Sequence, residues 1–67
     1  MFKFKLVKFN DGRYGARRWF FGYDYLDIDQ PHKYDWSKAE HVDRYCKGPR
    51  EVVEKAINTY YDKGTPV

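Results

Sequence analysis

Three side chains of the types that bind metal ions or act as nucleophiles stand close together in the sequence, namely His41, Asp43 and Cys46. On a helix, His41 and Cys46 are five positions apart and do not share a face, and on a strand Cys46 points away from the other two. A cysteine nucleophile also needs a base and an orienting group, and no local motif supplies them. We therefore expect no metal site and no catalytic residue here, and interpret Cys46 as a buried structural thiol.

The acidic residues Asp24, Asp27 and Asp29 form a second candidate. Such carboxylates could bind a divalent cation or form a glycosidase pair, but glycosidase carboxylates flank a substrate cleft. A chain of 67 residues leaves little room for a cleft. We expect the acidic row to pair with Arg17 and Arg18 on a neighbouring strand. The sequence therefore predicts a protein that is not an enzyme and has no cofactor.

Residues 14–22 interleave arginine with aromatic side chains. On a strand, this composition suits a single-stranded nucleic-acid platform, and the same residue types dominate protein-binding hot spots. The purely structural alternative places Trp19 and Phe21 in the core. Because 21% of the residues are aromatic, we expect more rings than one core can enclose, and exposed rings mark a partner site. The expected partner-binding residues are Arg13, Tyr14, Arg17, Arg18, Phe20, Tyr23 and Tyr25.

A β-hairpin is predicted to position these residues. The first residues alternate apolar and basic side chains as far as Leu6, which indicates a strand. Asp11-Gly12 then favours a two-residue type I′ turn, in a register that sets Val7 opposite Ala16. This register assigns to the core face the side chains of Phe2, Phe4, Leu6, Trp19 and Phe21.

The rest of the chain predicts a third strand over residues 23–29 and one or two helices. Ser37 and Glu40 have capping-box spacing, so residues 37–47 are predicted as a short helix with Gly48 after its end. A fourth strand over residues 41–46 is the alternative. Pro49 suits the first position of a C-terminal helix that Gly64 ends. Its apolar stripe consists of Val52, Val53, Ala56, Ile57 and Tyr60.

Together these elements predict one small α+β domain over residues 1–67, with residues 65–67 as a short tail. We expect an antiparallel meander of three strands, or of four in the alternative, with the C-terminal helix packed on one face. The single cysteine suits a reducing cytoplasm. No apolar run approaches the ~20 residues of a membrane span, so we expect no membrane partner.

Short motifs are spread over most of the chain: Asp11-Gly12-Arg13-Tyr14-Gly15, Arg17-Arg18-Trp19, Tyr25-Leu26-Asp27, Trp36-Ser37, Tyr45-Cys46 and the final amphipathic helix. This pattern resembles small accessory proteins encoded by tailed phages and prophages. The resemblance implies a protein that acts in the bacterial cytoplasm by binding a host or defence macromolecule stoichiometrically, as inhibitors do. We expect the partner to be a bacterial protein or protein complex, with nucleic acid and self-association as alternatives.

Overall fold

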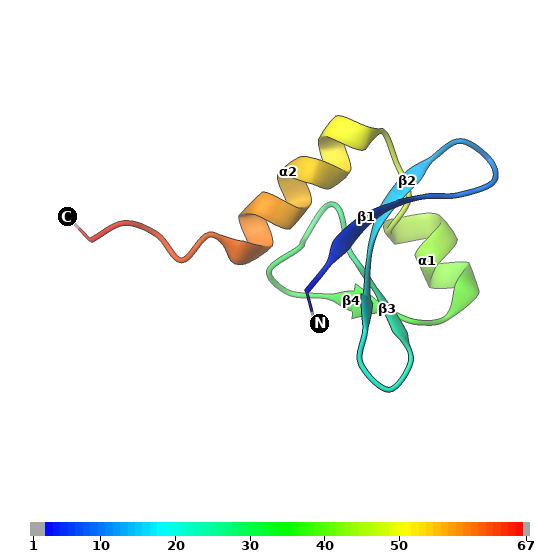
Figure 1. Ribbon diagram of the computed structural model, residues 1–67, viewed down its shortest axis with the longest axis horizontal. Coiled ribbons are helices and arrows are strands. Elements are labelled where there is room, and N and C mark those ends of the chain that lie inside the picture. Colours follow the sequence, from blue (N-terminus) through cyan, green and yellow to red (C-terminus); the bar gives the residue numbers. More distant parts are fainter. Residues whose placement is uncertain (1–2, 67) are drawn as a thin grey trace.

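Four antiparallel strands form one sheet, in the order β1-β2-β3-β4, in the computed structural model, which describes residues 3–66. The elements are β1 (Lys5–Lys8), β2 (Tyr14–Trp19), β3 (Tyr23–Leu26), β4 (Asp35–Trp36), α1 (Ala39–Tyr45) and α2 (Arg50–Tyr61). The two helices lie on opposite sides of the sheet (Figure 1). The predicted α+β fold with a C-terminal helix on one face is confirmed, and the fourth strand lies before α1 and not within it.

The β1–β2 hairpin is shifted by one residue from the predicted register. Leu6 lies opposite Ala16. The amide of Phe9 donates to the carbonyl of Arg13 at 2.8 Å, and the amide of Gly12 donates back to the carbonyl of Phe9 at 3.0 Å. Gly12 has a φ of 89°. The turn is therefore a three-residue loop that ends in a left-handed glycine, and the predicted two-residue turn is wrong.

The shifted register changes which side chains of β2 face the core. A slip of one residue moves a strand's side chains to the other face of the sheet. Trp19 is 52% exposed and Phe21 is 92% exposed, so their predicted place in the core is wrong. Phe2, also assigned to the core face, lies outside the described residues. On β2, Ala16 and not Trp19 faces the core, and Ala16 is fully buried.

The core lies between the sheet and α2. Its buried members are Phe4, Ala16, Leu26, Val53 and Ala56, with Leu6, Tyr14, Ile28 and Ile57 packed against them. The apolar stripe of α2 thus faces the sheet as predicted, while Val52 and Tyr60 lie at its exposed margin. The helix ends at Tyr61, three residues before the predicted stop, and residues 62–66 form neither helix nor strand.

The predicted helix over residues 37–47 is confirmed in a shorter form. Its N-cap is Lys38, and no side-chain cap hydrogen bond forms, so the predicted capping box is absent. Gly48 does not have the positive φ of a left-handed cap. Its backbone instead pairs with Tyr14 through two hydrogen bonds of 2.8 and 2.9 Å. This bridge ties the segment between the helices to the start of β2.

The third strand ends at Leu26, and the next residue, Asp27, is buried, at 4% exposed. Its Oδ1 accepts hydrogen bonds from the amides of Asp29 and Gln30 at 2.8 and 3.0 Å, and its Oδ2 accepts one from Trp36 Nε1 at 3.0 Å. A buried carboxylate that is satisfied in this way fixes the loop between β3 and β4. The predicted pairing of Asp27 with an arginine is therefore wrong.

Candidate functional site

Arg13 is held by two carboxylates beside the β1–β2 turn. Its Nη2 lies 2.7 Å from Asp11 Oδ2 and 2.6 Å from Asp43 Oδ1. Hydrogen bonding to this guanidinium lowers the pKa of both carboxyl groups. These contacts join the turn to α1, so the charge of Arg13 is largely neutralised within the protein.

Arg18 is also neutralised, on the side of the sheet that α2 covers. Its Nη2 lies 3.3 Å from Asp24 Oδ2 and 2.9 Å from Asp35 Oδ2. Its Nη1 donates to the hydroxyl of Tyr60 at 3.2 Å, and its guanidinium lies over the ring of Phe4, 4.4 Å from the ring centre. The predicted pairing of Arg18 with the acidic strand is confirmed for Asp24.

Arg17 points to the other side of the sheet and has a different environment. Its guanidinium carbon lies 4.3 Å from the ring centre of Tyr23, which is on the adjacent strand. The ring of Trp19 meets the same Tyr23 edge to face, with ring centres 5.0 Å apart. Within residues 3–66, no carboxylate forms an ion pair with Arg17. Its charge is therefore stacked on an aromatic ring but not neutralised.

These side chains share one surface with two lysines. We call the surface formed by Lys3, Lys5, Arg17, Trp19 and Tyr23 the open face. Together with Leu6 and Val7 it lines a hollow of about 260 Å³, and the described residues around this hollow include three cations and no carboxylate. The register explains this cluster, because Lys5 lies opposite Arg17 and Trp19 lies opposite Tyr23. Like charges directly opposite each other destabilise a sheet. The pairing of Lys5 with Arg17 therefore does not contribute to the stability of the fold.

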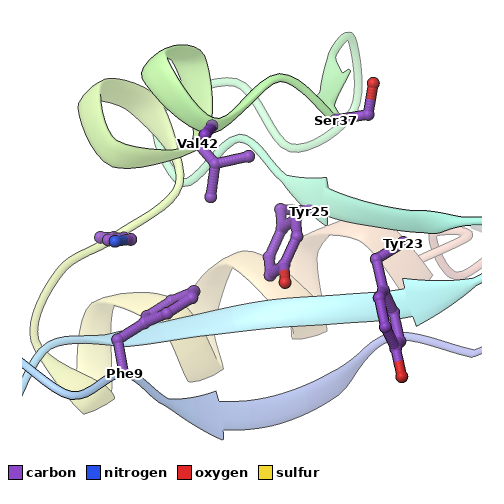
Figure 2. Close-up of a pocket in the computed structure, with 7 residues that line it drawn as sticks. Phe9, Tyr23, Tyr25, Ser37 and Val42 are labelled. Atoms are coloured by element: carbon purple, nitrogen blue, oxygen red, sulfur yellow. The ribbon is translucent and has the colours of Figure 1, made fainter.

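Beyond Tyr23, α1 closes over the same side of the sheet. Figure 2 shows the rings of Phe9, Tyr25 and Tyr23 following one another across the strands, with Val42 of α1 pointing toward them. Phe9 and Tyr25 have ring centres 5.7 Å apart. The hollow beneath the helix has a volume of about 400 Å³, and Tyr23 lines both hollows. The helix thus limits how far a ligand could extend along this side.

The predicted partner-binding residues do not form one cluster. Arg17 and Tyr23 belong to the open face, and Tyr25 adjoins it beneath α1. Arg13 and Arg18 are held in ion pairs, Tyr14 packs against the core, and Phe20 lies in the β2–β3 turn. Lys3, Lys5 and Trp19 were not among the predicted residues, and only the correct hairpin register would have placed them with Arg17.

Cys46 is buried, as the sequence predicts. It is fully shielded from solvent, and its Sγ lies 3.5 Å from the carbonyl oxygen of Tyr25. Burial raises the pKa of its thiol to about 12, which keeps it protonated near neutral pH and disfavours nucleophilic attack. Among the described residues, no group of three or more His, Cys, Asp and Glu side chains could hold a metal ion.

Comparison with known proteins identifies no relative. No protein-family model, no curated protein and no solved structure matches the chain. No helix within residues 3–66 is long and apolar enough to cross a membrane. What the protein does must therefore be inferred from its own residues, and above all from the open face.

Proposed function

We propose that the protein is a non-catalytic binding protein of the phage or prophage accessory type. It engages a bacterial host or defence macromolecule through the open face. One observation carries this proposal: the chain gathers Lys3, Lys5 and Arg17 around two rings, and both rings are about half exposed, Trp19 at 52% and Tyr23 at 48%. Exposed aromatic side chains in such a cluster mark an interaction surface.

The charge of the open face supports an acidic partner surface. Arg13 and Arg18 are each neutralised by two carboxylates, whereas no carboxylate in the described part of the chain pairs with Arg17. Unneutralised cations steer a partner of opposite charge during encounter, and the rings supply contact area once the two surfaces meet. The proposed binding is stoichiometric and takes place in the host cytoplasm.

Capture of partners from a bacterial lysate tests the proposal, with charge reversal on the open face. The test variant is Lys5→Glu/Arg17→Glu, which replaces one pair of like charges across the strands with another. The matched control is Lys33→Glu/Lys55→Glu, which changes the net charge equally at exposed positions away from the open face.

We expect the wild type and the control to capture the same macromolecule, and the open-face variant to lose it. Circular dichroism verifies that all three proteins are folded. Capture of the same macromolecule by the open-face variant, or equal loss in the control, would remove the open face from the proposed function.

A further inference from the structure

The lysines of the open face favour a partner that carries phosphate groups. Two of its three cations are lysines, Lys3 and Lys5. Lysine is depleted in protein–protein interfaces, whereas lysine and arginine are the side chains that neutralise nucleic-acid phosphates. Because no carboxylate is found among the described residues that line the hollow, a polyanion meets no repulsive group from them.

The guanidinium of Arg17 is held in a position from which it can bind phosphate. Stacking 4.3 Å from the ring centre of Tyr23 restricts its movement. No acceptor in residues 3–66 forms an ion pair with it. A planar guanidinium with free N–H groups binds phosphate oxygens through two parallel hydrogen bonds. Restricting the side chain beforehand reduces the entropy that is lost on binding.

The rings of the open face are placed where unpaired bases could reach them. Trp19 and Tyr23 lie opposite each other on neighbouring strands, and each is about half exposed. Exposed rings on a sheet stack with bases of single-stranded nucleic acids in a way that tolerates any sequence. The bases of a duplex are stacked inside it and cannot reach such rings.

We infer that the macromolecule bound by the open face is a single-stranded nucleic acid, an inference that rests on the function proposed above. Bases stack on Trp19 and Tyr23, and phosphates bind Lys3, Lys5 and Arg17. Two rings, at one base for each ring, accommodate about two bases. The described helices do not suit groove binding, because α1 has seven residues and α2 carries Glu51 and Glu54 beside its basic residues.

Fluorescence anisotropy with labelled oligonucleotides tests the inference. The probes are oligothymidylate and oligouridylate of about 12 nucleotides and a DNA duplex of equal length. We expect both single strands to bind more tightly than the duplex. Neutralising three phosphates gives a salt slope of about −2, so affinity should fall roughly 20-fold between 50 and 200 mM salt.

Variants of Trp19 separate the contribution of base stacking to the affinity from that of the positive charges. Trp19→Ala should weaken binding roughly 10- to 100-fold, while Trp19→Phe should restore most of the loss because it keeps a ring. Tyr34→Ala is the control, since Tyr34 is as exposed as Tyr23, at 48%, and lies away from the open face. No binding of either single strand at 50 mM salt, tighter binding of the duplex, or equal weakening by Tyr34→Ala would overturn the inference.

Nuclease treatment of the lysate separates this inference from the proposed function. If the oligonucleotides do not bind, but nuclease-treated lysate still yields a protein that Lys5→Glu/Arg17→Glu fails to capture, the open face binds a protein. The proposed function then stands and the nucleic-acid inference is wrong. If neither assay detects a partner that depends on the open face, both are wrong.

Discussion

Arg17 lies over the ring of Tyr23, with its guanidinium carbon 4.3 Å from the ring centre. The two residues belong to adjacent strands. Arg17 is paired across the ladder with Tyr25, and Tyr23 is paired with Trp19. The contact is therefore diagonal, and it keeps a cation on the open face where no carboxylate of residues 3–66 neutralises it.

A double-mutant cycle should detect this contact as a small coupling energy. The coupling energy between the two side chains should be about 0.5–1 kcal/mol, as expected for an exposed cation–π pair. It is obtained from the variants Arg17→Ala, Tyr23→Ala and the double variant. Urea unfolding followed by circular dichroism measures the three differences. A coupling of zero would mean that the stacked geometry is not populated in solution.

Gly15→Ala should destabilise the protein by about 1–3 kcal/mol through overpacking. A Cβ at this position would lie 2.7 Å from Cε2 of Phe9 and 3.1 Å from the carbonyl oxygen of Cys46. The ring cannot retreat easily because it packs beside Tyr25. Chemical unfolding measures the loss.

The control for Gly15 is Gly48→Ala. Its new Cβ would meet only the end of a flexible side chain, Ile28 Cδ1, at 2.9 Å. We expect this variant to lose less stability than Gly15→Ala. If both variants lose the same stability, the close packing of the Phe9 ring against Gly15 is not the reason that glycine is needed at this position.

The sequence predicted the elements of the fold better than the positions of their side chains. The alternation before Leu6, the glycine after Asp11 and the stripe around Val53 are local patterns, and each corresponds to an element in the structure. Asp27 was misread although two of its hydrogen bonds are local, from the amides of Asp29 and Gln30. Its third partner, Trp36 Nε1, comes from the other end of the loop between β3 and β4, and no local pattern reveals it.

The open face was predicted only in part because it depends on one loop residue. Asn10, Asp11 and Gly12 fit a three-residue loop as well as Asp11 and Gly12 fit a two-residue turn. The choice decides whether Trp19 faces the core or the solvent. Like charges face each other across the strands in both registers, so charge gave no signal. The burial of Ala16 against α2 settles the register.

Acid should weaken the contact between the hairpin turn and α1. Arg13 lowers the pKa of Asp11 and Asp43, chiefly through hydrogen bonds. Since the folded state favours the ionised carboxylates, their stabilisation is present above the unfolded pKa of about 4 and is lost as pH falls through the lower folded values. The urea midpoint should therefore fall as pH decreases from about 5 to about 2.

The variant Arg13→Gln separates the stabilisation by Asp11 and Asp43 from that of the other carboxylates. It should lower the urea midpoint near neutral pH and make the midpoint fall less as the pH decreases. Because the groups are exposed, about 1 M salt should shrink the difference between the two proteins. An identical pH profile in both proteins would contradict the assignment to Arg13.

Cys46 should be unreactive in the folded protein. A thiol with a pKa of about 12 is thiolate in about 10⁻⁴ of the molecules at pH 8, and the thiolate is the reactive form. Ellman's reagent should therefore react with the folded protein far more slowly than with the urea-unfolded chain. Similar rates would mean that the segment around Cys46 opens readily.

The Phe21→Ala variant should be less stable than the Phe21→Gly variant, although alanine is ordinarily the more stabilising of the two residues. Its φ of 57° lies in the left-handed region, which costs residues other than glycine about 1–2 kcal/mol. Because the ring is 92% exposed, both replacements remove similar packing, and their difference reports backbone strain. We expect Phe21→Gly to be more stable than Phe21→Ala by about 1 kcal/mol in urea unfolding. The neighbouring Phe20, which has no positive φ, should show the ordinary order with alanine at least as stable as glycine. If alanine is the more stable replacement at both positions, the tip of the β2–β3 turn does not hold Phe21 in a strained conformation.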